Sequence, residues 1–101
     1  MKVRWTNTAV AHLVAIHEYI ARDSARYAAR MVDRITARSK QIGTFPQAGH
    51  AVPEYQTDNL REVIEGPYRV IYEVGSSEIW VLAVIHGAQL LPPAAPRSDA
   101  R

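Results

Sequence analysis

Residues 60–86 read LREVIEGPYRVIYEVGSSEIWVLAVIH and contain three runs that are rich in β-branched and aromatic side chains. The breaks between the runs are Gly66 with Pro67 and the three residues 75–77, which are short enough for hairpin turns. This stretch therefore predicts an antiparallel meander of three strands. Near the start of the chain, residues 2–5 (KVRW) form a shorter strand candidate.

Two amphipathic helices are predicted between the short strand and the meander. Thr6 or Asn7 can cap the first helix, in which apolar residues recur at helical spacing. Ser24 can cap the second, and its apolar stripe continues to Gly43, which we expect to end the helix. Residues 44–59 show no clear periodicity and predict a connecting loop.

The resulting order, βααβββ, predicts a single α+β domain in which the N-terminal strand and a helical hairpin pack on an antiparallel sheet. A length of 101 residues and a hydrophobic content of 48% suit one core. We assign residues 1–91 to this domain and expect the Pro- and Ala-rich residues 92–101 to form a flexible tail. The sequence shows neither a signal-peptide pattern nor an apolar run long enough to span a bilayer, so we expect a cytoplasmic protein without membrane contact.

Positive charge is concentrated in the first part of the chain. Residues 1–42 contain eight basic and three acidic side chains, whereas residues 43–101 contain four and seven. Five arginines recur at four-residue spacing along the second predicted helix: Arg22, Arg26, Arg30, Arg34 and Arg38. This arginine ladder is either a solvated face opposite the apolar stripe or a surface that binds an acidic partner.

A metal site or other cofactor is not expected. The chain contains no cysteine, and His12 and His17 are five positions apart. Two histidines that share a metal on a helix are usually four positions apart, so this pair does not match the pattern.

Arg69 stands inside the second run of the meander. Because the tyrosines and valines of this run form the better core face, alternation places Arg69 on the face that points away from the helices. There we expect it to meet Arg61 or Glu62 from the preceding strand and His86 from the end of the last. Arg69 is either a catalytic or substrate-binding cation or the structural partner of a carboxylate such as Glu62 or Glu73.

Several short motifs occur in a fixed order: VRWT at residues 3–6, FPQAGH at 45–50, LRE at 60–62, GPYRVIY at 66–72 and VIHG at 84–87. With these motifs the chain resembles the RelE/ParE family of toxins from bacterial type II toxin–antitoxin pairs over roughly residues 2–90. The resemblance implies the βααβββ fold and a small toxin that a cognate antitoxin holds inactive in a hetero-oligomeric complex.

The resemblance leaves two targets open, because RelE-like members cut mRNA on the ribosome whereas ParE-like members poison DNA gyrase. RNA cleavage needs a base, an acid and cations that stabilise the charged phosphorane. The candidates for this chemistry are Glu54 and His86 as proton-transfer groups, with Arg61 and Arg69 as phosphate binders.

Few cations lie in the predicted sheet half, where no lysine follows Lys40 and where Ala88 and Gln89 occupy positions that are basic in many relatives. We therefore predict a ParE-like toxin that binds gyrase and has no conventional active site. The arginine ladder, Arg61, Arg69 and His86 are then the candidate target- or antitoxin-binding residues. The alternatives are a RelE-like ribosome-dependent mRNA endonuclease and a non-toxic module that only binds its antitoxin.

Overall fold

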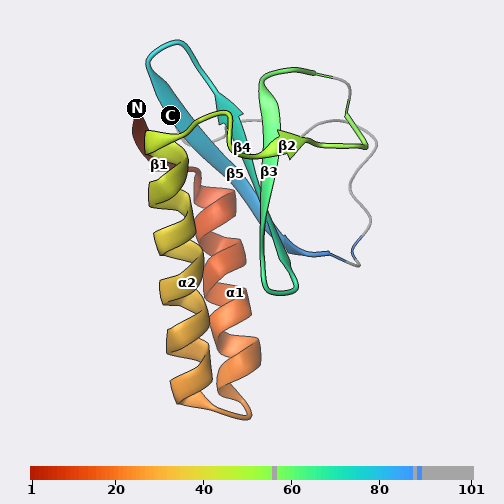
Figure 1. Ribbon diagram of the computed structural model, residues 1–101. Helices are drawn as coiled ribbons and strands as arrows, with labels where there is room; N and C mark the ends of the chain where they lie inside the picture. Colours follow the sequence, from red (N-terminus) through yellow and green to blue (C-terminus); the bar gives the residue numbers. More distant parts are fainter. Residues whose placement is uncertain (56, 88, 90–101) are drawn as a thin grey trace.

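The computed structural model describes residues 1–55, 57–87 and 89 of the chain (Figure 1). Its elements, in chain order, are β1 (Lys2–Trp5), α1 (Asn7–Ala21), α2 (Ala25–Thr44), β2 (His50–Ala51), β3 (Leu60–Glu65), β4 (Tyr68–Val74) and β5 (Glu78–His86). The predicted order and α+β class are confirmed, with β2 as an additional two-residue strand. The predicted tail at residues 92–101 lies outside the described residues, so the division into domain and tail stays a prediction.

The five strands form one sheet in the order β1-β5-β4-β3-β2. Strands β3, β4 and β5 are the predicted antiparallel meander, and β2 extends it by pairing antiparallel to β3. The N-terminal strand β1 joins the sheet at one edge, where it runs parallel to β5. After β1 the chain passes through both helices to β2 at the opposite edge of the sheet. The meander then returns the chain to β5 beside β1.

Both predicted helix starts are confirmed by capping hydrogen bonds. The hydroxyl of Thr6 accepts from the backbone N–H of Ala9 at 3.0 Å, and that of Ser24 accepts from Tyr27 at 3.1 Å. The expected end of α2 at Gly43 was wrong, because the helix continues to Thr44. Phe45 leaves the helical region since the residue before a proline, here Pro46, is disfavoured there.

Gly43 serves a different purpose from a helix stop. A Cβ atom at this position would lie 2.7 Å from the carbonyl oxygen of Met1, which is closer than real contacts allow. The missing side chain lets the start of the chain pack against α2, where the Met1 amino group donates to the Gly43 carbonyl at 2.6 Å. This glycine therefore fixes the N-terminal edge of the fold.

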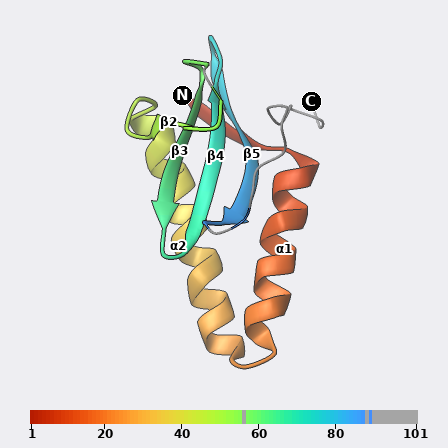
Figure 2. The same cartoon turned by 90° about the vertical axis from the view of Figure 1, so that its right-hand side faces the viewer.

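The helical hairpin covers one face of the sheet, and its tip extends beyond the strands (Figures 1 and 2). Between the helices and the sheet lies the larger core, with Met31 and Ile35 from α2 against Val70 and Tyr72 from β4. A second apolar cluster lies on the opposite face: Val52, Tyr55, Leu60, Ile71, Trp80, Leu82, Ala83 and Ile85. Because this cluster includes residues of the loop after β2, the central strand β4 is buried on both faces.

A β-bulge in β5 changes which of its side chains face the helices. Ile71 pairs with Ala83 but Tyr72 pairs with Val81, so Leu82 is an extra residue in the ladder. Before the bulge, Val81 packs in the helix-facing core, and after it Val84 does so. The alternation of inward and outward side chains is therefore shifted by one residue after Leu82. As a result, His86 pairs with Tyr68 and faces the helix side.

Candidate functional site

Arg69 lies on the sheet face away from the helices, as predicted, and is only 8% exposed. Its Nε and Nη2 donate to Glu62 of β3 at 2.8 and 2.9 Å. Its Nη1 and Nη2 donate to Glu54 of the loop after β2 at 2.8 and 2.9 Å. A guanidinium has five N–H groups, so these two carboxylates occupy four of them. The expectation of a carboxylate partner is confirmed for Glu62, and Glu54 is a second one.

This carboxylate clamp, defined as Glu54, Glu62 and Arg69, carries more negative than positive charge. The hydrogen bonds from Arg69 hold the pKa of Glu54 below its usual range, although partial desolvation acts in the opposite direction. The pKa of Arg69 is raised by its hydrogen bonds to Glu54 and then to Glu62, so the guanidinium stays charged. An incoming phosphate would have to displace a carboxylate before it could form a bidentate pair with Arg69.

Arg61 and His86 do not join this clamp. Arg61 precedes Glu62 and therefore points to the other face, where its Nη1 donates to the Gly49 carbonyl at 2.8 Å. The bulge in β5 turns His86 to the same helix side, where its ring meets Tyr68 edge-on at 5.8 Å between centroids. Of the two expected partners on β3, Arg69 meets Glu62 and not Arg61, whereas the expected contact with His86 was wrong. Of the three other nuclease candidates, only Glu54 lies beside Arg69.

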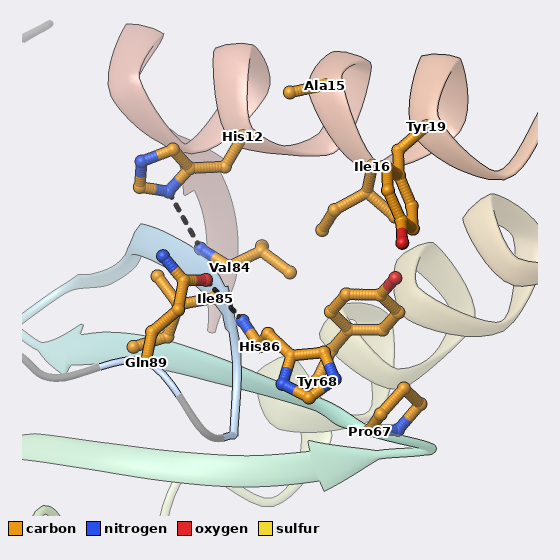
Figure 3. A pocket seen from close by; sticks show the side chains of 10 residues that line it. All are labelled: His12, Ala15, Ile16, Tyr19, Pro67, Tyr68, Val84, Ile85, His86 and Gln89. Atoms are coloured by element: carbon orange, nitrogen blue, oxygen red, sulfur yellow. Dashed lines mark hydrogen bonds between the residues drawn. The ribbon is translucent and has the colours of Figure 1, made fainter.

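A hollow of about 560 Å³ lies between α1 and the ends of β4 and β5 (Figure 3). His12 and Tyr19 of α1 line one side, and Tyr68, His86 and Gln89 line the other. The Tyr19 and Tyr68 hydroxyl groups point toward one another in Figure 3. Burial raises the pKa of Tyr68, and the nearby phenols add to this effect. The hollow thus combines aromatic surface with a few polar groups, as binding sites commonly do.

Two hydrogen bonds fix the walls of this hollow. His12 Nδ1 accepts from the backbone N–H of Val84 at 3.1 Å, which ties α1 to β5. The Gln89 side-chain oxygen accepts from the His86 backbone N–H at 2.7 Å, and the Gln89 N–H donates to the His86 carbonyl at 2.9 Å. Gln89 therefore closes the end of β5. Our sequence analysis did not place His12 or Tyr19 in a site, although they share a helix face with Ile16.

The arginine ladder is divided by its contacts. Arg34 forms an ion pair with Glu65 at 2.7 Å, and Arg38 donates to Gln41 at 3.1 Å. Near the hairpin tip, Arg22 lies over the ring of Tyr19 at 5.9 Å from its centroid. Arg26 and Arg30 are exposed. Some arginines of the ladder thus contact other side chains of the domain, and others are exposed to solvent. The role of the ladder in partner binding stays a prediction.

Within the described ranges, no group of three His, Asp or Glu side chains is arranged to hold a metal ion. None of the described helices is both long enough and apolar enough to cross a bilayer.

Comparison with known proteins places these features in a family context. Residues 3–91 match the family described as ParE toxin of type II toxin–antitoxin system, parDE. The chain is also similar to Toxin RelE2 of Caulobacter vibrioides, with 32% identity over 90 residues that cover 88% of this chain and 98% of that protein.

Two solved structures share the fold. The chain is similar to a structure of the chromosomal ParDE toxin–antitoxin system of P. aeruginosa, with a TM-score of 0.71 and 25% identity over 85% of this chain and 95% of that one. The toxin–antitoxin complex RelBE2 of Mycobacterium tuberculosis matches with a TM-score of 0.60 and 19% identity, covering 84% of this chain and 95% of that one. At that identity the second likeness concerns the fold alone.

Proposed function

We propose, from the premise that the chain belongs to the ParE family of type II toxins, that it acts by binding DNA gyrase and that a cognate antitoxin neutralises it. In this proposal the toxin stabilises a broken-DNA state of gyrase and cleaves no RNA itself. Its site of action is then the cytoplasm, where gyrase and chromosome lie. The resemblance to ParE-like members supplies the target, and the chemistry of the carboxylate clamp supports the choice.

The single observation that carries the proposal is that two carboxylates already accept hydrogen bonds from four of the five N–H groups of Arg69. Cleavage of RNA through its 2′-hydroxyl requires cations placed to stabilise charge that develops on the phosphate. Arg69 is a buried cation on the sheet face away from the helices, and its donors are already directed at Glu54 and Glu62. Two carboxylates around one guanidinium repel a phosphate, so this group is poorly suited to transition-state stabilisation.

The proton-transfer candidates support the same conclusion. Glu54 lies with Arg69 on the sheet face away from the helices, whereas His86 lies on the helix face beside Tyr68. A general acid and a general base must both reach the reacting phosphate within hydrogen-bond distance. Side chains on opposite faces of one sheet do not converge in this way.

For the antitoxin, the hollow beside α1 is the surface we favour. Tyr19 of α1 lines this hollow and is 66% exposed, beside the apolar side chains of Ile16 and Val84. An exposed aromatic side chain at the edge of an apolar hollow suits a partner segment that folds on binding. The similar structures are of a toxin–antitoxin system and a toxin–antitoxin complex, which agrees with such a partner.

The proposal is tested with purified toxin in two reactions run in parallel. In a reaction of gyrase, ATP and supercoiled plasmid, we expect the toxin to increase the yield of linear, gyrase-linked DNA, and equimolar antitoxin to suppress it. In a cell-free translation reaction at the same concentration, we expect protein synthesis to continue. Arrested translation with transcripts cut in the ribosomal A site, and no linear DNA, would establish the RelE-like alternative instead. Inactivity in both reactions, with antitoxin still bound, would identify a non-toxic binding module.

A further inference from the structure

Two arginines on the helix side of the sheet have donors that the domain itself does not use. Among the described residues, only two buried side-chain nitrogen or oxygen atoms have no hydrogen-bond partner, and they are the Nε atoms of Arg38 and Arg61. A buried N–H without an acceptor loses its hydration and gains nothing in return. Such groups call for a specific explanation when they occur together.

The two orphan donors lie around the same turn, which joins α2 to β2. Arg61 donates its Nη1 to the carbonyl of Gly49, and Arg38 lines a hollow that Ala48 also lines. The Tyr72 hydroxyl accepts from the Gly49 N–H at 3.0 Å and donates to the Pro46 carbonyl at 2.9 Å, which holds the turn in place. Burial raises the pKa of this phenol, while the charges of both arginines act on it in the opposite direction.

No carboxylate of the described chain forms an ion pair with either arginine. The nearest acidic side chains of β3 are already engaged, since Glu65 pairs with Arg34 and Glu62 pairs with Arg69 on the other face. Both side chains are partly exposed, so a ligand would reach them through their exposed atoms and not through the buried Nε. The turn therefore carries two positive charges without a counter-charge in the described chain. An oxyanion is the ligand that matches this arrangement.

The surroundings of the pair indicate what carries the oxyanion. The adjacent hollow of about 300 Å³ is lined mainly by apolar side chains, including Ile42, Phe45 and Val63. Phe45 is 65% exposed at its rim. Within the described sheet β2 pairs only with Arg61 and Glu62, so residues 63–65 have no strand neighbour on that side. An extended peptide with an acidic residue two positions from an apolar one fits this edge better than a bare phosphate does, because both side chains then point to the helix face.

We propose that Arg38 and Arg61 form a binding site for a carboxylate side chain from an acidic segment of a protein partner. An apolar side chain two positions away in that segment occupies the hollow beside Phe45. The site rests on the proposed function only in that a binding toxin needs protein partners. It lies on a different part of the surface from the hollow beside α1.

The test is a titration of the ¹⁵N-labelled toxin alone, observed through its arginine Nε–H signals by NMR. The probe is a capped Leu-Ala-Glu tripeptide, and the matched control is a capped Leu-Ala-Gln tripeptide of nearly the same shape. We expect the glutamate probe to shift the signals of Arg38 and Arg61 together, with one dissociation constant, while those of exposed Arg26 and Arg30 move little. The glutamine control should bind at least about tenfold more weakly, because it lacks the charge.

Variants and a second anion complete the test. Arg38→Met should lower the affinity of the toxin for the glutamate probe about tenfold, whereas Arg26→Met should leave this affinity unchanged. A thermal melt of Arg38→Met, which leaves the Arg61–Gly49 contact in place, reports whether the fold is retained. Equal shifts with the glutamine peptide, or shifts at Arg38 and Arg61 no larger than at Arg26, would overturn the proposal. Binding of inorganic phosphate without binding of the glutamate probe would also overturn it. Because gyrase and antitoxin are absent, failure here leaves the gyrase proposal intact.

Discussion

The arginines on the two faces of the sheet differ in what the domain provides for them. On the face away from the helices, Arg69 is buried and two carboxylates occupy four of its five donors. On the helix face, Arg38 and Arg61 have no carboxylate partner in the described chain, and each has a buried Nε without an acceptor. The first arrangement is complete without a ligand, and the second is not.

This difference indicates where the protein presents charge to other molecules. A guanidinium that is neutralised internally contributes to the fold and offers little attraction to an anion. A pair of unneutralised guanidinium groups beside an apolar hollow offers charge and shape to a protein segment. For Arg69 the sequence left two roles open, a catalytic or substrate-binding cation and the partner of a carboxylate, and we assign it to the second.

The largest effect is expected from removal of the clamp's cation. Arg69→Met leaves Glu62 buried without a counter-charge, since its side chain is only 5% exposed. We expect the free energy of unfolding to fall by about 3–5 kcal/mol, measured by urea denaturation at pH 7. Adding Glu62→Leu to this variant should restore most of the loss, because no buried charge remains. A loss below about 1 kcal/mol would show that the clamp is not a stability element.

An intermediate effect is expected from pH, through Glu54. The folded-state pKa of this carboxyl is lowered by Arg69 below the usual value of 4.5. Its contribution is therefore fully present above about pH 4.5 and is lost as pH falls through the lower, folded value. The stability difference between the natural protein and Glu54→Gln should be constant from pH 7 to 5 and shrink below it. A difference that grows on acidification would contradict the ion pair.

The smallest effect is expected at the unneutralised pair. Arg38→Met removes an orphan donor and one of two like charges, and loses only the bond to Gln41. We expect the free energy of unfolding to change by no more than about 0.5 kcal/mol in the same urea assay. A loss comparable to that of Arg69→Met would mean that the domain depends on Arg38, and the contrast between the two faces would fail.

Local signals in the sequence were sufficient for most of the fold. Thr6 and Ser24 mark the helix starts because capping is decided within three residues. The strands of the meander follow from alternation and from short turns, and their observed bounds agree with the predicted runs. The exception among the helix ends was Gly43, whose role depends on Met1, a residue far away in sequence.

The composition of the site was less predictable because it depends on non-local geometry. The extra residue Leu82 reverses the facing of His86, and no local pattern in residues 78–86 marks the bulge. Glu54 lies in a segment without periodicity, so alternation could not assign it to a face. Only the folded loop brings it to Arg69, fifteen residues further along the chain. The Arg38–Arg61 pair combines a residue of α2 with a residue of β3, so it could not be predicted from either segment alone.

The most direct test of the account asks whether toxicity needs the clamp's charges once the fold is secured. The variant Glu54→Gln, Glu62→Leu, Arg69→Met removes all three charges and should stay folded, because apolar replacement of a complete buried ion cluster is often neutral. Antitoxin binding and a cooperative thermal melt serve as folding controls. On controlled expression, we predict that this variant still arrests growth and induces the DNA-damage response. A folded, antitoxin-binding variant that no longer arrests growth, while the natural protein cuts mRNA, would make Arg69 catalytic and contradict the account.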